Sequence, residues 1–270
     1  MNREEKIKYL KDAKHYNFYD LVSVVEILRA PGGCPWDAEQ THKSIREDFI
    51  EETYEVVEAM DNDDKDLLCE ELGDVMLQVV FHACIETEKG TFQINDVING
   101  ICRKLIHRHP HVFADVSVDG TEQVLSNWDK IKSEEKHRET VTSKLKSVPR
   151  QLPALMRAEK VGKKAKCFDF PNAESVFLKL EEEKNELYEA YQNGDAQSVE
   201  EELGDLLLTV TSLSRKLGVR SENALNKATD KFIDRFEAVE NEVIAEKLDI
   251  NELSMTELDA IWDKNKEKMH

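Results

Sequence analysis

Four carboxylates recur at the same spacing in two separate stretches of this sequence. Residues 51–74 and 182–205 align without a gap at an offset of 131 residues (182 minus 51), and 12 of the 24 aligned positions are identical. The shared acids are Glu52, Glu55, Glu71 and Asp74 in the first copy and Glu183, Glu186, Glu202 and Asp205 in the second. Apolar neighbours changed while these acids stayed, so the spacing indicates a binding site rather than a solvated surface.

The geometry of helices suggests what this site would bind. Glu52 and Glu55 share one face of a helix at i and i+3, and Glu71 and Asp74 do the same on the next helix. A short turn makes the two helices antiparallel neighbours, which brings the four acids together. Such like charges repel unless a cation neutralises them. Oxygen ligands favour Mg²⁺, with Mn²⁺ as a possible substitute, over zinc.

A di-iron carboxylate bundle also gathers acids between helices, but it uses Glu-x-x-His pairs. The matching positions here hold Glu55, Asp74, Glu186 and Asp205, so iron chemistry fits less well.

Basic and aromatic residues also recur after each acidic stretch. They are Lys104, Arg108 and Trp128 in the first half and Lys231, Arg235 and Trp262 in the second. A Lys and an Arg at i and i+4 can clamp a polyphosphate, and a tryptophan can stack on any nucleobase. Taken alone, either tryptophan fits a core or interface role equally well.

One difference separates the copies. Lys179 lies one helical turn before Glu183, whereas the equivalent position in the first half is Asp48. A polyphosphate would meet a positive charge in one site and a negative charge in the other. Electrostatics therefore favour the second half as the better triphosphate site.

Composition limits the class of protein. The 270 residues include 56 Asp and Glu against 37 Lys and Arg, which gives a formal net charge of −19. Such a surface repels phosphate backbones, so we expect no nucleic-acid partner. The five cysteines form no CxxC pair, which is typical of reduced thiols, and the apolar runs are too short to span a bilayer. We expect a soluble, cytoplasmic protein with no membrane partner.

The pattern of residues predicts an all-α fold. Glycine and proline are scarce, at 10 and 6 residues, and apolar residues recur at helical spacing. The predicted helices cover about 3–15, 18–29, 44–60, 65–88, 95–109, 121–137, 153–165, 173–192, 196–217, 221–245 and 255–268. We expect Asp64 and Asp195 to cap the helices that follow them. The charged stretch 133–146 predicts a linker between two duplicated helical-bundle domains, 1–145 and 146–270.

Several motifs together carry a family resemblance. They are GlyCysProTrpAsp at 33–37, GlnThrHis at 40–42, the two acidic quartets, ArgHisProHisValPheAla at 108–114 and LeuProAlaLeuMetArgAlaGluLys at 152–160. Over nearly its whole length the chain closely resembles the MazG nucleoside triphosphate pyrophosphohydrolases. The resemblance implies two MazG-type domains, assembly as a homodimer, and Mg²⁺-dependent cleavage of nucleoside triphosphates to monophosphate and pyrophosphate.

The resemblance also assigns roles in the second half. It implies metal binding by the quartet at Glu183, Glu186, Glu202 and Asp205, and nucleotide contacts by Lys179, Lys231, Arg235 and Trp262. The chain departs from the family at Cys167-Phe168-Asp169-Phe170, where GlyPheAspTrp is common.

Metal-assisted hydrolysis is the reaction these residues favour, with Glu183 or Glu202 as the general base. A permissive tryptophan stack predicts broad base tolerance. Two alternatives remain: a nucleotide-sensing or partner-binding module, at least in the first half where Asp48 replaces a lysine, and a purely structural helical scaffold.

Overall fold

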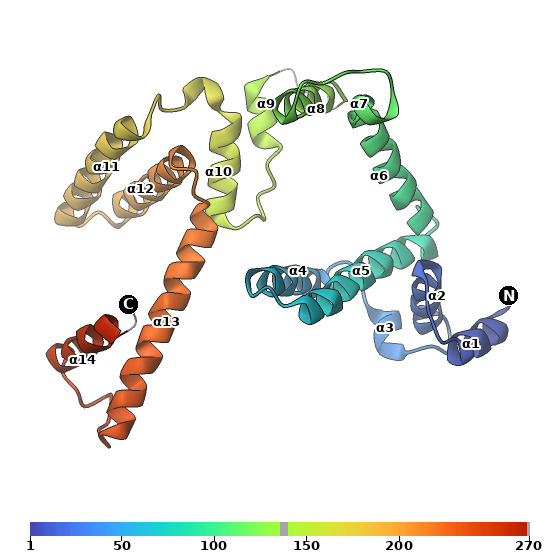
Figure 1. The fold of residues 1–270 in the computed structure, drawn as a ribbon, viewed down its shortest axis with the longest axis horizontal. Coiled ribbons are helices and arrows are strands. Elements are labelled where there is room, and N and C mark those ends of the chain that lie inside the picture. Colours follow the sequence, from blue (N-terminus) through green and yellow to red (C-terminus); the bar gives the residue numbers. More distant parts are fainter. Residues whose placement is uncertain (136–139, 269–270) are drawn as a thin grey trace. The chain divides into compact units, whose positions relative to one another are not determined.

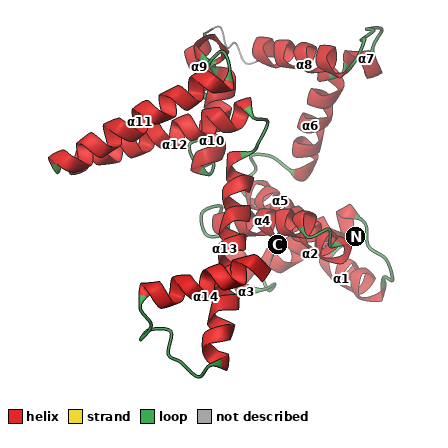
Figure 2. Ribbon diagram, turned by 60° about the vertical axis from the view of Figure 1, so that its left-hand side comes forward, coloured by secondary structure: helices red, strands yellow, loops and turns green. Residues whose placement is uncertain are grey.

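The computed structural model describes residues 1–135 and 140–268, and every regular element in these ranges is a helix (Figures 1 and 2). The chain divides into two compact units, Met1–Lys132 and Ser133–His270. The first unit contains α1 (Arg3–Asp12), α2 (Phe18–Arg29), α3 (Pro35–Glu39), α4 (Arg46–Asp61), α5 (Lys65–Glu88), α6 (Ile94–Arg108), α7 (Pro110–Phe113) and most of α8 (Thr121–Glu135). The second contains α9 (Val141–Lys146), α10 (Ala154–Lys164), a short 3-10 turn (Lys166–Phe168), α11 (Ala173–Asn193), α12 (Ala196–Lys216), α13 (Ser221–Ala245) and α14 (Met255–Lys268).

The structure confirms the all-α class, and the long predicted helices are present with ends shifted by no more than three residues. The end of the helix predicted over 121–137 lies outside the described residues. The short helices α3, α7 and α9 were not predicted, and α9 lies within the stretch expected to be a linker. The domain boundary near residue 145 stays a prediction. None of the described helices combines the length and apolar character needed to cross a membrane.

Each unit contains one long helical hairpin, α4 with α5 and α11 with α12. The two turns have matching geometry. Asp63 and Gly194 occupy equivalent positions in the left-handed region, with φ of 54° and 70°. The next residue caps the following helix in each case: the Asp64 carboxylate accepts from two backbone N–H groups of α5, and Asp195 does the same for α12. These caps confirm the expectation from sequence and fix where α5 and α12 begin.

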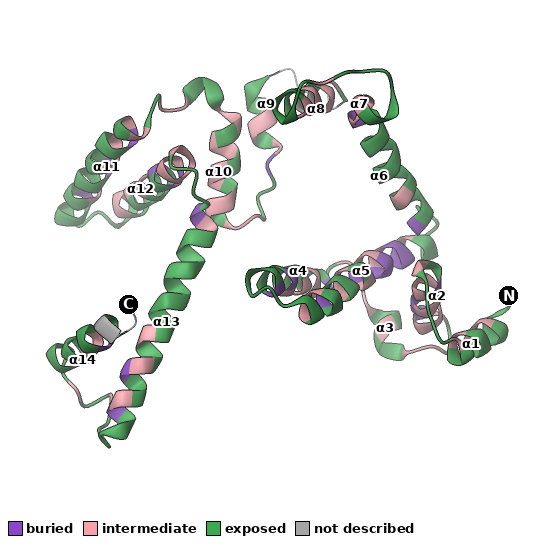
Figure 3. Cartoon of the chain, in the orientation of Figure 1, coloured by how far each residue is buried: buried purple, intermediate pink, exposed green. Residues whose placement is uncertain are grey.

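The main hydrophobic core of the first unit lies along the C-terminal half of α5, where α2 and α6 pack against it (Figure 3). Val25 and Val80 are almost completely buried there, with Phe81 and Ile85 beside them. Apolar side chains near the α4–α5 turn, including Val57 and Met60, are exposed. The acidic end of the hairpin is therefore outside the core.

In the second unit, α11 packs on α12, α10 contacts α12 and α13, and α14 lies against α13. Val176, Val239 and Val243 are buried in these seams. Many large apolar side chains remain exposed, among them Leu203 and Leu207 on α12 and Phe232 and Ile233 on α13.

Candidate active site

The helical hairpin of the second unit brings three of the four predicted acids together. Glu183 and Glu186 come from α11 and Glu202 from α12, and each offers a carboxylate oxygen within 4.8 Å of the others. Glu183 is only 5% exposed. Asp205 lies on the same helix as Glu202 but is exposed and outside this group.

The first unit repeats the arrangement with Glu52, Glu55 and Glu71, whose carboxylate oxygens also lie within 4.8 Å of one another. Glu71 is 9% exposed. Asp74 is outside this group, yet its charge is close enough to raise the pKa values of Glu52 and Glu71. In both units, three glutamates meet, and the fourth acid, an aspartate three residues after the last of them, lies outside the group.

Three glutamates of the two clusters have raised pKa values. Burial, followed by the charge of Asp74 and contacts with Glu55, raises the pKa of Glu52 to about 7. Burial and the charges of Glu55 and Asp74 raise the pKa of Glu71. Burial also raises the pKa of Glu186, against the opposing charge of Lys179. Carboxylates so placed fit a hard divalent cation, which supplies the missing positive charge and takes oxygen ligands.

Lys179 contacts the second cluster directly. Its Nζ lies 3.0 Å from Oε1 of Glu183 and 2.7 Å from Oε1 of Glu182. Hydrogen bonds to Glu182 and then Glu183 raise the lysine pKa above its ordinary value. Sequence reasoning placed Lys179 at the phosphates of a substrate and missed Glu182 as its partner. An i, i+3 spacing of Lys and Glu on one helix is the signal that indicates this pair.

The other predicted nucleotide contacts lie on α13 and α14. Lys231 is exposed and Arg235 is partly buried on α13, and the Trp262 ring packs 5.3 Å from the Phe232 ring, between centroids. Among the described residues, α13 packs against α10, α14 and the end of α12, and has no comparable contact with α11. Within the described part of the chain, Lys231, Arg235 and Trp262 therefore lie on helices that do not pack against the helix of Glu183 and Glu186.

Two of the equivalent residues in the first unit, Arg108 and Trp128, contact each other. The Arg108 guanidinium lies 5.2 Å from the centroid of Trp128, and Nζ of Lys132 lies 4.5 Å from it. Arg108 is 4% exposed. These cation–π contacts already use the Trp128 ring in this conformation, whereas Lys104 is exposed.

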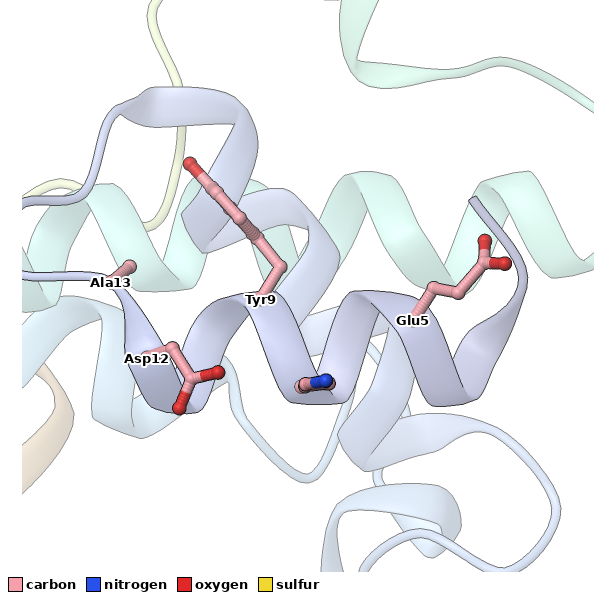
Figure 4. Close-up of a pocket in the computed structure, with 5 residues that line it drawn as sticks. Glu5, Tyr9, Asp12 and Ala13 are labelled. Carbon is pink, nitrogen blue, oxygen red and sulfur yellow. The ribbon is translucent and has the colours of Figure 1, made fainter.

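A recess on the surface of α1 is formed by residues that are distant in sequence from both quartets. It is lined by Glu5, Lys8, Tyr9, Asp12 and Ala13, and the labelled side chains do not converge on one point (Figure 4). No quartet residue lines it. The carboxylate clusters therefore remain the better candidates.

Known proteins resemble this chain over most of its length. The family model described as the MazG nucleotide pyrophosphohydrolase domain matches residues 40–113 and 172–240, segments that contain the two quartets. The nucleoside triphosphate pyrophosphohydrolase/pyrophosphatase MazG of Thermotoga maritima is 45% identical over 251 residues, covering 92% of this chain and 95% of the relative. The nucleoside triphosphate pyrophosphohydrolase of Escherichia coli is 43% identical over 251 residues, covering 91% and 95%. A protein of that name from Mycobacterium tuberculosis is 33% identical over 246 residues, covering 87% and 64%.

Proposed function

This chain belongs to the MazG nucleotide pyrophosphohydrolase family, and we propose that it hydrolyses nucleoside triphosphates to nucleoside monophosphate and pyrophosphate with Mg²⁺ as cofactor. The observation that carries this proposal is the cluster of Glu183, Glu186 and Glu202 between α11 and α12. Mn²⁺ would substitute, since it accepts the same oxygen ligands.

We propose separate roles for the acidic and the basic side chains in this reaction. Glu183, Glu186, Glu202 and Asp205 would hold the ion. When bound, Mg²⁺ supplies positive charge that offsets the charge of the phosphates. Glu183 or Glu202 accepts the proton of the water that attacks the α-phosphorus, and pyrophosphate leaves. Lys231 and Arg235 bind the phosphates and stabilise the charge on the leaving group.

We propose the second unit as the main catalytic site. Its cluster has a lysine, Lys179, where the first unit has Asp48. A triphosphate is repelled less by a cluster that carries its own cation. Stacking of a base on Trp262 would accept any base, so we propose broad base tolerance and a housekeeping role in the nucleotide pool.

We further propose that the protein works as a homodimer in the cytoplasm. Lys231, Arg235 and Trp262 lie on helices that do not pack on α11, so a second copy would have to bring its basic helix to the cluster. Exposed apolar residues such as Leu207 and Phe232 would then be covered. The five cysteines are free thiols, which is consistent with a reducing compartment.

A second role is favoured for the first unit. Asp48 places a negative charge one helical turn before Glu52 in sequence, and the Trp128 ring is already in contact with Arg108 and Lys132. We propose that this unit binds nucleotide or a partner with little turnover.

The reaction is tested by incubating the protein with several nucleoside triphosphates and Mg²⁺ and identifying the products. We expect monophosphate and pyrophosphate, and Glu202→Ala should lower the rate by about a hundredfold or more. Glu71→Ala should have a small effect, and Glu200→Ala, an exposed acid two residues away, should have none. Release of orthophosphate would refute the reaction, and loss of turnover in Glu71→Ala alone would assign it to the first unit.

A further inference from the structure

The two carboxylate clusters differ in what neutralises them. In the second unit, the Lys179 ammonium lies 3.0 Å from a Glu183 side chain that is only 6% exposed. In the first unit, the equivalent position is Asp48, and Glu52 occupies the place of Glu183. The first cluster therefore has no lysine at the position from which Lys179 contacts Glu183.

Lys179 and a divalent ion cannot both neutralise Glu183 in the same way. An ion bound to the carboxylate oxygens lies about 2 Å from them, and an ammonium at 3.0 Å from the same oxygen would be repelled by it. Lys179 has somewhere to go, because its side chain is 32% exposed and flexible. It also pairs with Glu182, which is 57% exposed and outside the quartet.

We propose that Lys179 is a displaceable counter-ion of the second cluster: its ammonium neutralises Glu183 before a divalent ion binds, leaves Glu183 when the ion arrives, and then binds a phosphate of the nucleotide. This inference rests on the proposed function, since it takes a divalent ion and a nucleoside triphosphate as ligands of the cluster. It adds an order of binding: the ion releases the side chain that the nucleotide needs.

The divalent ion can replace the ammonium because it takes over the neutralisation of Glu183. Loss of the ammonium alone would leave the carboxylate of Glu183, which is 6% exposed, buried without a partner. A divalent ion interacts with several carboxylates at once and outcompetes one ammonium.

This arrangement predicts effects of opposite sign when the lysine is removed. Lys179→Met should tighten Mn²⁺ binding in the absence of nucleotide by about three- to tenfold, because the competing ammonium is gone. The same variant should weaken binding of an α,β-imido nucleoside triphosphate, in the presence of saturating Mn²⁺, by about tenfold or more, because a charged hydrogen bond is lost. A structural role for Lys179 would weaken both.

The experiment is isothermal titration of the full chain with Mn²⁺ alone and then with the analogue. A Glu71→Ala background weakens binding at the first unit. Lys184→Met is the matched control, because Lys184 lies on the same helix and pairs with Glu181 outside the cluster. Both affinities should be unchanged in this control.

Unchanged or weaker Mn²⁺ binding in Lys179→Met would refute the role of Lys179 as a counter-ion and would leave the proposed function intact. If Mn²⁺ binding is instead unaffected by Glu202→Ala, the cluster is not a metal site, and the proposed function fails with the inference.

A reciprocal variant keeps the proposal testable if Lys179→Met does not fold. Asp48→Lys, in a Glu202→Ala background, gives the first cluster the lysine it lacks. It should weaken Mn²⁺ binding there and strengthen binding of the analogue. Tighter Mn²⁺ binding in this variant would contradict the proposal.

Discussion

Nδ1 of His42 lies 2.8 Å from Nδ1 of His82, and the two rings stack with their centroids 5.0 Å apart. Nε2 of His42 lies 2.6 Å from Oε1 of Glu86. Lys89 donates a hydrogen bond to the same oxygen, and the Thr91 hydroxyl donates to Oε2 of Glu86. Only one of the two facing Nδ1 atoms can carry the hydrogen that joins them. This chain of contacts fastens the segment before α4 to α5.

The histidine pair makes the stability of the first unit depend on pH. Burial, and then the charge of His42, lowers the pKa of His82 below its ordinary 6.5, and hydrogen bonds from Lys89, Thr91 and His42 lower that of Glu86 from 4.5 to about 2. Both shifts favour the deprotonated form. The stabilisation of the fold by each group is therefore fully present above that group's ordinary pKa, and it is lost as the pH falls from that value through the lowered pKa. We expect the free energy of unfolding to drop from pH 7 to pH 5, and again below pH 4.5.

Urea unfolding at pH 7, 6 and 5 measures the histidine contribution. His82→Gln should flatten the slope over this range, and His15→Gln, which changes an exposed histidine, should not. Parallel curves for the wild type and His82→Gln would show that His82 does not carry the pH dependence.

Gly33 is required by a close approach of backbone atoms. A Cβ at this position would lie 2.2 Å from the carbonyl oxygen of Leu28 and 2.3 Å from that of Ile27. The chain turns tightly here, with the Cys34 N–H donating to Leu28 O at 2.7 Å. Gly33→Ala should therefore destabilise the first unit by about 2 to 3 kcal/mol in urea unfolding. Gly100→Ala, in a helix with no atom near the added methyl, should be neutral or stabilising. An equal loss of stability in the two variants would show that the close contacts at Gly33 do not require a glycine.

Sequence patterns predicted what depends on local periodicity. The long helices follow apolar spacing, and α5 and α12 begin at the expected caps, Asp64 and Asp195. Three of the four acids meet in each unit, among them the i and i+3 pairs Glu52 with Glu55 and Glu183 with Glu186. The short helices carry too few residues to show a period, so they were missed.

Contacts between distant residues could not be predicted in the same way. His42 and His82 are 40 positions apart, and nothing in either local pattern indicates their pairing. Several acids follow Lys179 on the same helix. The rotamer of the Lys179 side chain decides that it pairs with Glu182 and Glu183. Lys231 and Arg235 were expected to contact the phosphates because a Lys and Arg pair recurs after each quartet, but the packing of α13 decides where they lie.

Asp169 anchors the segment in which this chain departs from the family pattern. Its carboxylate accepts from Arg215 at 2.6 Å and from Lys216 at 2.9 Å. Burial opposes ionisation, but the hydrogen bonds from both basic residues outweigh it and lower the pKa of Asp169. Asp169→Asn should destabilise the second unit by about 1 to 3 kcal/mol at pH 7. Thermal and urea unfolding would measure this loss, and Asp259→Asn, an exposed position on α14, is the control. An equal effect of the two substitutions would show that Asp169 is no anchor.

Metal binding to the first cluster should release protons at neutral pH. The pKa of Glu52 is raised to about 7 by burial and by the charges around it, so the carboxyl is about half protonated at pH 7 in the absence of metal. A divalent ion requires the ionised form, so Mn²⁺ affinity should rise as pH increases through 7, and about half a proton should leave per ion bound at pH 7. Titration of Mn²⁺ into the Glu202→Ala protein, in two buffers with different ionisation heats, gives the number of protons released. Glu52→Gln should weaken binding and reduce the difference between buffers, while Glu58→Gln, on an exposed position of α4, should change neither. Equal heats in both buffers for the Glu202→Ala protein would show that Glu52 is already ionised before the metal binds.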